Sequence, residues 1–144
     1  MEYEIKRLRP EDAGLLSRVA EDVFDADIHP DRLADFLSDS QHAMVIALID
    51  GEVVGQARGI VHLQPDQPHE FYVDNMGVTP RLWRQGIGGR ILDELLGWAR
   101  ERGCGYAWQG TEEDNVEARA LYESRGGHST PMLMFELRAR PGKG

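Results

Sequence analysis

The chain contains only one cysteine, Cys104, among its 144 residues. A single cysteine excludes an internal disulfide, and no apolar run approaches the length that spans a bilayer. The five histidines are scattered without the short spacings typical of metal ligands, so the sequence predicts no metal site. The first residues also lack the character of a signal peptide. We therefore expect a cytoplasmic protein with no membrane association.

Basic residues are few as well, with 16 Lys and Arg against 25 Asp and Glu, for a net charge of −9. This balance disfavours nucleic-acid binding, which depends on a basic surface. A negative cleft concentrates cations and suits a cationic small-molecule substrate, although the same charge also serves solubility alone. The length predicts one domain over residues 1–144, with residues 138–144 as a frayed tail.

Apolar periodicity and turn residues predict a mixed architecture of strands and helices. The predicted strands are residues 2–8, Ala43–Ile49, Val53–Leu63, Glu70–Val78, Tyr106–Gln109 and Met132–Leu137. The predicted helices run from Pro10 to the break at His29-Pro30, from Leu33 to Ser40, from Ile87 to Arg102, and from Asp114 to Ser124, where Asp114 and Glu117 form a capping pair. Asp50-Gly51 predicts a hairpin turn. The fold class is α/β, or α+β in strict terms.

The most informative stretch is the Gly-rich turn between the strand Glu70–Val78 and the helix that begins at Ile87. Glycines allow close approach of the backbone, and the first N–H groups of a helix point at an anion, so this arrangement is typical of a phosphate cradle. A G-x-G match alone is weak. Only Gly86/Gly88 lies between a strand and a long helix, and it is neither a Rossmann nor a Walker motif. The alternative is a tight turn that binds nothing.

Two motifs carry a family resemblance. Val78-x-Pro80 followed by Arg84-Gln85-Gly86-Ile87-Gly88-Gly89 resembles the acyl-CoA signature of the GNAT superfamily of N-acyltransferases. Asn115-x-x-Ala118-x-x-Leu121-Tyr122-x-x-x-Gly126 resembles the late helix of the same superfamily. One departure is Trp83, which occupies the position where the family usually has Gln or Arg.

The resemblance implies a mixed, mostly antiparallel central sheet, splayed at the cofactor site and flanked by about four helices. It implies acetyl-CoA as co-substrate, no metal, and a homodimer. The backbone of the strand end would pair with the pantetheine arm like an added strand, and the turn would hold the pyrophosphate. The implied coenzyme contacts are Met76, Gly77, Val78, Arg84, Gln85, Gly86, Ile87, Gly88, Gly89, Arg90, Asn115 and Tyr122.

The implied chemistry is direct attack of a primary amine on the thioester in a ternary complex. The resemblance makes Tyr122 the acid that protonates the leaving thiolate, whereas spacing alone favours a core tyrosine. The base is open between Asp74 and Glu70, which share a strand face, and a water chain. Asn115 either contacts pantetheine or merely caps its helix.

The acceptor amine is not identified by the sequence. Phe24, Asp25, Asp27 and His29 are candidate substrate contacts, or simply loop and capping residues. The full set of predicted substrate-binding residues is Phe24, Asp27, Asn75, Glu112, Glu113 and Asp114. A distant likeness of the C-terminal half to aminoglycoside 3-N-acetyltransferases offers a narrower hypothesis. The alternative from another class is a catalytically silent acyl-CoA-binding sensor or interaction module.

Overall fold

The computed structural model describes residues 2–140, and the chain divides into two compact units, residues 1–111 and 112–144. Each unit is described by itself. The prediction of one domain over residues 1–144 stays a prediction. Of the predicted tail, residues 138–140 form neither helix nor strand, and residues 141–144 lie outside the described residues.

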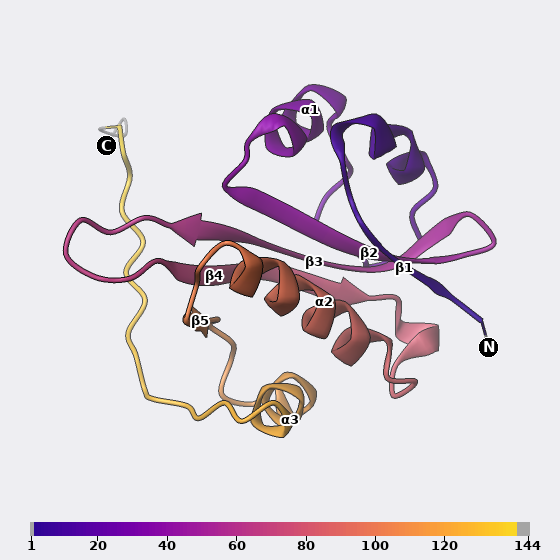
Figure 1. Cartoon of the computed structure of the whole chain (residues 1–144). Coiled ribbons are helices and arrows are strands. Elements are labelled where there is room, and N and C mark those ends of the chain that lie inside the picture. Colours follow the sequence, from indigo (N-terminus) through magenta and orange to yellow (C-terminus); the bar gives the residue numbers. More distant parts are fainter. Residues whose placement is uncertain (1, 141–144) are drawn as a thin grey trace. The chain divides into compact units, whose positions relative to one another are not determined.

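The first unit is built on a five-stranded sheet with the strands in sequence order (Figure 1). The strands are β1 (Glu4–Arg7), β2 (His42–Ile49), β3 (Glu52–His62), β4 (Glu70–Val78) and β5 (Tyr106–Trp108). Neighbouring strands are antiparallel except β4 and β5, which are parallel. The sheet is therefore mixed and mostly antiparallel, as predicted. Asp50 and Gly51 both have positive φ angles, 48° and 78°, which confirms the hairpin turn.

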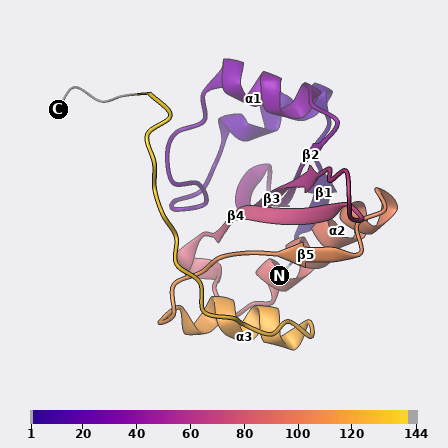
Figure 2. The ribbon, with the colours of Figure 1, turned by 90° about the vertical axis from the view of Figure 1, so that its left-hand side faces the viewer.

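Helices cover both faces of this sheet (Figures 1 and 2). One face carries η1 (Pro10–Ser17) and α1 (Pro30–Ser38), whose apolar residues pack with Met44, Ile46 and Val53. The other face carries α2 (Ile87–Glu101), where the Trp98 ring lies 5.9 Å from that of Phe71. A short η2 (Pro80–Leu82) precedes α2. No helix in residues 2–140 combines the length and apolar character needed to cross a membrane.

The first predicted helix is much shorter than expected. Helical structure ends at Ser17, and Val19 forms an isolated parallel bridge with Val53. The N–H of Val53 donates to Arg18 O at 2.9 Å, and the N–H of Ala20 donates to Val53 O at 2.8 Å. Because these backbone groups bond to β3, they cannot continue a helix. Residues 20–28 form instead a loop, which we call the acceptor loop because it carries two of the predicted acceptor contacts, Phe24 and Asp27.

The second unit contains α3 (Val116–Ser124). The predicted capping pair Asp114 and Glu117 is wrong, because Asn115 Oδ1 accepts the N–H of Ala118 at 3.1 Å. The predicted strand Met132–Leu137 is also wrong. This segment has no assigned strand, and its five large apolar side chains are 70% to 89% exposed. A strand requires a hydrogen-bonding partner, which an apolar pattern alone does not supply.

Candidate active site

The predicted phosphate cradle has the expected backbone geometry. Leu82 and Ile87 are buried and anchor both ends of a turn in which Arg84, Gln85 and Gly86 are exposed. Gly86 has a φ of 82°, in the left-handed region that favours glycine. The first intrahelical bond runs from the N–H of Arg90 to Gly86 O at 3.2 Å. The amides before it, at the N-terminus of a helix of 15 residues, have no intrahelical acceptor and point out of the helix.

The two arginines near the turn differ in their surroundings. Arg84 has a φ of 64°, an uncommon backbone conformation for a residue with a side chain. The guanidinium of Arg90 lies over the Tyr3 ring, 5.8 Å from its centroid. Both side chains are exposed beside the turn. Their predicted contacts with phosphates stay predictions.

Strand β4 leaves the edge that continues toward the turn uncovered. On one side β4 pairs with β3 through Val78, but on the other side β5 pairs only with Glu70, Phe71 and Tyr72. From Val73 onward no strand of the first unit's described residues covers that edge (Figure 2). This is the splayed sheet that the resemblance implies. The open edge and the turn are continuous, since Val78 is followed by η2 and the turn.

Trp83 contacts this edge directly. The N–H of Thr79 donates to Val54 O at 2.9 Å, so the backbone groups of Val78, one residue earlier, face away from β3. The indole Nε1 of Trp83 donates to Val78 O at 2.6 Å, although the side chain is 52% exposed. Trp83, which stands where the family usually has Gln or Arg, therefore donates a hydrogen bond to the Val78 carbonyl on the open edge. Sequence reasoning did not foresee this contact.

The two candidate bases share one side of β4. Glu70, Tyr72 and Asp74 alternate with the buried Phe71 and Val73. The carboxylate of Asp74 pairs with Arg58, with Nε and Oδ2 3.1 Å apart. That of Glu70 contacts His62, with Oε1 and Nδ1 3.2 Å apart. Both carboxylates thus have partners in the first unit, and neither role is decided by this geometry.

The acceptor loop borders a hollow of about 870 Å³ between η1 and α1. Phe24 and Asp27, both predicted as substrate contacts, line this hollow, and Asp25 lines it too. Asn75, also predicted, lies on β4 and donates through Nδ2 to Asp25 Oδ2 at 2.9 Å. His29 instead caps α1 by accepting the N–H of Arg32 at 3.3 Å.

Gln56 is a residue of this region that the sequence did not single out. It is fully buried in β3, and its Nε2 donates to Asn75 Oδ1 at 2.7 Å and to Val23 O at 3.1 Å. Gln56 lies within a strand of otherwise mostly apolar and small residues. A polar residue at a buried strand position was the one available signal.

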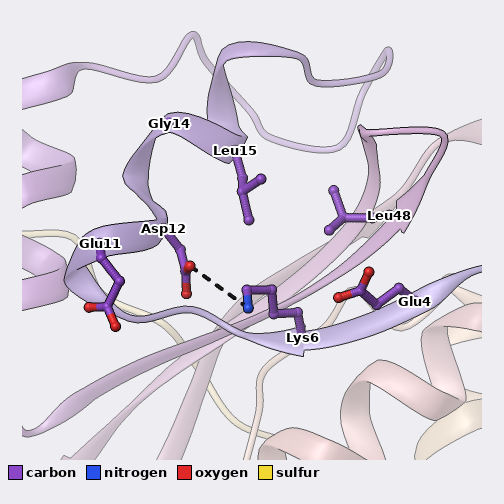
Figure 3. A pocket seen from close by; sticks show the side chains of 7 residues that line it. All are labelled: Glu4, Lys6, Glu11, Asp12, Gly14, Leu15 and Leu48. Atoms are coloured by element: carbon purple, nitrogen blue, oxygen red, sulfur yellow. Dashed lines mark ion pairs between the residues drawn. The ribbon is translucent and has the colours of Figure 1, made fainter.

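A second hollow, of about 410 Å³, lies over β1 (Figure 3). Figure 3 shows Lys6 and Asp12 pointing toward each other, and their Nζ and Oδ1 atoms are 3.8 Å apart. Strands β2 and β3 separate β1 from β4 in the sheet. Because its lysine is paired and it is remote from the open edge, we assign no role to this hollow.

The remaining predicted residues lie in the second unit. Glu112, Glu113 and Asp114 precede α3 and are exposed, and the Glu113 carbonyl accepts from Arg119 Nη1 at 2.8 Å. Asn115 caps α3, as described above. Tyr122 is half-buried, and the resulting desolvation raises the pKa of its phenol to about 12, so the phenol is protonated at neutral pH.

Other chemistry has little support in the residues described. No group of three or more His, Cys, Asp or Glu side chains in residues 2–140 is arranged to hold a metal ion. Burial raises the pKa of the Cys104 thiol, which reduces its thiolate fraction and its nucleophilicity.

Residues 8–127 match the family described as "Acetyltransferase (GNAT) family". The chain belongs to the GNAT family. Its open β4 edge and Gly-rich turn are the parts of the structure that correspond to the acyl-CoA signature found in the sequence. The GNAT family comprises acetyl-CoA-dependent N-acetyltransferases, and the relatives with named activities are N-acetyltransferases.

Three sequence relatives differ in their identity to this chain and in how much of each protein the match covers. The chain is 34% identical over 125 residues to an uncharacterised protein of Mycobacterium leprae, covering 85% of this chain and 33% of that protein. It is 42% identical over 76 residues to the N-alpha-acetyltransferase RimI of Mycobacterium tuberculosis, covering 53% and 46%. It is 25% identical over 139 residues to an aminoglycoside N(6′)-acetyltransferase type 1 of Stenotrophomonas maltophilia, covering 91% and 90%. The chain thus spans less than half of the first two relatives.

Solved structures share the GNAT fold. An aminoglycoside acetyltransferase, meta-AAC0020 from an uncultured soil metagenomic sample, has a TM-score of 0.81 at 18% identity, covering 96% of this chain and 97% of its own. AAC(6′)-Iy in complex with a bisubstrate analogue has a TM-score of 0.78 at 16% identity, covering 97% and 100%. AAC(6′)-Iy and the Stenotrophomonas relative carry a 6′ designation, whereas the sequence resemblance was to 3-N enzymes. At 16% to 18% identity, these likenesses show the fold alone.

Proposed function

We propose that this protein binds acetyl-CoA and transfers its acetyl group to a primary amine by direct attack within a ternary complex. The observation that carries the proposal is the edge of β4 that β5 leaves uncovered, continuous with the Gly-rich turn at the start of α2. The pantetheine arm would pair with Met76, Gly77 and Val78. The pyrophosphate would be held by backbone amides from Gln85 to Arg90.

The proposed reaction needs three proton transfers. The amine must first lose a proton because an alkylammonium ion, with a pKa of about 10, has no lone pair. Its nitrogen then forms a bond to the thioester carbonyl carbon, the C–S bond breaks, and the nitrogen loses a second proton to become a neutral amide. Tyr122 gives its proton to the departing thiolate, a role that its protonated phenol suits, and the resulting tyrosinate takes up the second proton of the nitrogen. The first amine proton passes to Asp74, to Glu70 or to a chain of water molecules. Asn115 would make a separate contact, with the pantetheine arm of the coenzyme.

The coenzyme site is tested by Gly88→Asp, with Gly97→Asp as control. Both glycines lie in α2, but only Gly88 is in its first turn. An acidic residue in the first turn stabilises a helix, so Gly88→Asp should fold, while its carboxylate repels the pyrophosphate. At Gly97 an added Cβ meets only arginine side-chain nitrogens, at 3.5 and 3.7 Å.

Calorimetric titration with acetyl-CoA measures the result. We expect Gly88→Asp to weaken binding at least about a hundredfold, since a like-charge contact replaces an anion site. Gly97→Asp should bind like the wild-type protein. Equal affinity of the Gly88→Asp variant and the wild-type protein would show that the turn does not hold the pyrophosphate.

We propose a small amine as the acceptor, in agreement with the net charge of −9. The RimI relative and the aminoglycoside relative suggest two further groups of acceptor, protein N-termini and aminoglycosides. A panel of acceptors with acetyl-CoA as donor separates them. The residues Phe24, Asp27, Asn75, Glu112, Glu113 and Asp114 are the proposed acceptor contacts.

A catalytically silent coenzyme sensor is the second candidate, because Trp83 caps Val78 O on the edge that pantetheine would use. A sensor would bind acetyl-CoA without acetylating any amine of the panel. Tyr122→Phe would then leave the affinity for acetyl-CoA unchanged, with no turnover to lose.

We also propose that the protein is a cytoplasmic homodimer. The location rests on the single cysteine, Cys104. The dimer rests on the five large apolar side chains of Met132–Leu137, which are 70% to 89% exposed, since covering them with a second copy would remove apolar surface from water. Light scattering should report a dimer for the wild-type protein and for Val116→Glu, an exposed control on α3, but a monomer for Leu133→Glu. A monomeric wild-type protein would contradict the proposal.

A further inference from the structure

Two aromatic rings stack at the point where the sheet divides. Tyr72 on β4 is paired with Trp108 on β5, and their ring centroids are 4.3 Å apart, with the ring planes inclined by 25°. This is the last paired position of the two strands, because β5 ends at Trp108 (Figure 2). The stacked pair, which we call the aromatic platform, therefore lies where the uncovered edge of β4 begins.

The platform lies on the face of the sheet opposite α2. Phe71, the residue before Tyr72, contacts Trp98 of α2, and neighbouring residues of a strand point to opposite faces. On the platform's face, η1 and α1 pack with an apolar cluster drawn from β2 and β3, to which no β4 residue of the described chain belongs. Tyr72 and Trp108 are accordingly only half-buried. Within the first unit, part of the platform is thus left uncovered.

The position of Tyr72 relates the platform to the proposed chemistry. An aromatic pair across neighbouring strands can also stabilise a sheet without binding anything. Tyr72, however, lies between Glu70 and Asp74, the two candidate bases, on the same side of β4. Alternate residues of a strand are about 7 Å apart. An amine that reaches either carboxylate is therefore within one such step of the platform.

The charged side chains beside the platform are engaged with one another. On one side Arg58 Nε lies 3.1 Å from Asp74 Oδ2, and on the other side His62 Nδ1 lies 3.2 Å from Glu70 Oε1. Each acid on this face of β4 thus has a basic partner on β3. The two rows frame the platform without adding an unpaired charge of their own.

Between these rows the side chains form an apolar strip across three strands. Ile60 of β3 lies opposite Tyr72, which in turn lies opposite Trp108, and all three are half-buried. Aromatic rings attract other flat rings, edge-to-face or offset, with centroids about 4.5–7 Å apart. The strip is therefore complementary to a flat apolar ring.

We propose that Tyr72 and Trp108 are specificity-determining residues that bind an aromatic ring of the acceptor, whose amine is carried on a short arm. The ring would pack against the exposed edges of the platform. An arm of two carbons then spans roughly the distance of about 7 Å from Tyr72 to the carboxylate on either side. The acceptor class is a small arylalkylamine. This inference rests on the proposed acetyl transfer.

The test compares 2-phenylethylamine with 2-cyclohexylethylamine, which has the same number of carbons and the same arm but a ring that is not flat. The quantity measured is the ratio of their kcat/KM values with acetyl-CoA as donor. Trp108→Leu and Tyr72→Leu each remove one ring and keep an apolar side chain. In each variant we expect the ratio to fall about two- to tenfold, the range by which an aromatic pair exceeds its area burial. The intrinsic basicity of the amines cancels, because it is the same for every variant.

Three further variants separate the rings from the fold. Phe36→Leu is the matched control, because Phe36 on α1 forms a ring pair with His42, with centroids 5.1 Å apart, outside the platform. It should keep the wild-type ratio. Tyr72→Phe keeps the ring without the hydroxyl and should also keep the ratio. Trp108→Phe keeps a smaller ring and should retain part of the preference. Circular dichroism checks that each variant is folded.

Each outcome bears on the inference or on the reaction. If both amines are acetylated and the ratio keeps its wild-type value in folded Trp108→Leu or Tyr72→Leu, the platform is overturned and acetyl transfer stands. If acetyl-CoA binds but neither amine is acetylated, calorimetry with the protein–CoA complexes decides. The wild-type complex must then bind 2-phenylethylamine more tightly than the Tyr72→Leu complex does, and equal affinity would overturn the platform. Absence of any acetyl-CoA binding would overturn the proposed function and this inference together.

Discussion

The two units of the chain differ in how their elements are held. The first unit buries apolar residues on both faces of its sheet, and its loop, strands and helices bond to one another. In the second unit α3 has no buried residue, and the cap on Asn115 and the turn at Gly126, with a φ of 82°, are local contacts. Roles assigned to β4 and α2 therefore rest on geometry. Roles assigned to Tyr122 and Asn115 rest on the family.

The largest expected effect concerns the core of the first unit. Phe71 is fully buried against Trp98, and Phe71→Ala should lower the free energy of unfolding by about 3–5 kcal/mol. Leu133 lies in the second unit and is 80% exposed, so Leu133→Ala should lower the free energy of unfolding of the monomer by less than about 0.5 kcal/mol. Urea denaturation at low protein concentration measures both. Comparable losses would show that the second unit is packed as firmly as the first.

The next effect concerns catalysis from the second unit. Tyr122→Phe should lower kcat about a hundredfold, the low end of the contribution of a general acid, and leave acetyl-CoA affinity unchanged. Steady-state kinetics and calorimetry measure the two quantities. Wild-type turnover would remove Tyr122 from the mechanism.

The same tyrosine predicts a dependence on pH. Its folded pKa of about 12 exceeds the ordinary value of about 10, so the unfolded state loses its proton first as the pH rises. The contribution of Tyr122 to stability is therefore complete below pH 10 and is lost between about pH 10 and 12. Tyr122→Phe should show a smaller fall in stability across that window than the wild-type protein.

Gly77 of β4 packs against the backbone of the acceptor loop at Val23 and Asp22. Gly77→Ala would place a Cβ 2.5 Å from Val23 O, a backbone atom that cannot rotate away. We expect a loss of about 1–3 kcal/mol in the free energy of unfolding, the usual cost of overpacking. Gly110→Ala is the control, because its Cβ would meet nothing within 4 Å. An unchanged Gly77→Ala variant would mean that the loop shifts easily, contrary to the close packing of Gly77 against Val23 O.

The smallest effect concerns Trp83. Trp83→Phe removes the indole N–H that occupies Val78 O. If the coenzyme uses that carbonyl, losing the competing donor should tighten acetyl-CoA binding about two- to tenfold, the net worth of one hydrogen bond. Weaker binding in calorimetry would show instead that the indole contacts the coenzyme.

Local signals predicted much of the first unit. The strand Glu70–Val78, the hairpin at Asp50-Gly51 and the helix from Ile87 all formed as expected, because turn residues and apolar periodicity act over a few positions. Long-range bonds explain the main error. The backbone hydrogen bonds of Arg18 and Ala20 with Val53 end the first helix, and the residues around Arg18 contain no sequence signal for these bonds.

The site was predicted less completely than the fold. The Gly-rich turn has a local signature, so its residues could be found in the sequence. Gln56 has only a weak local signal, a polar residue within an apolar strand, and its hydrogen-bond partners Val23 and Asn75 are distant in sequence. Met132–Leu137 has the composition of a strand, but pairing depends on an edge that the sequence does not identify.

The central claim is that the uncovered edge of β4 and the first turn of α2 together bind acetyl-CoA. Hydrogen–deuterium exchange with and without acetyl-CoA tests it most directly, because exchange of backbone amides reports on each segment separately. The account predicts slower exchange over Val73–Val78 and over Ile87–Arg90, with β2 unchanged. Acetyl-CoA that leaves both segments unprotected, or protects only other parts of the chain, would contradict it.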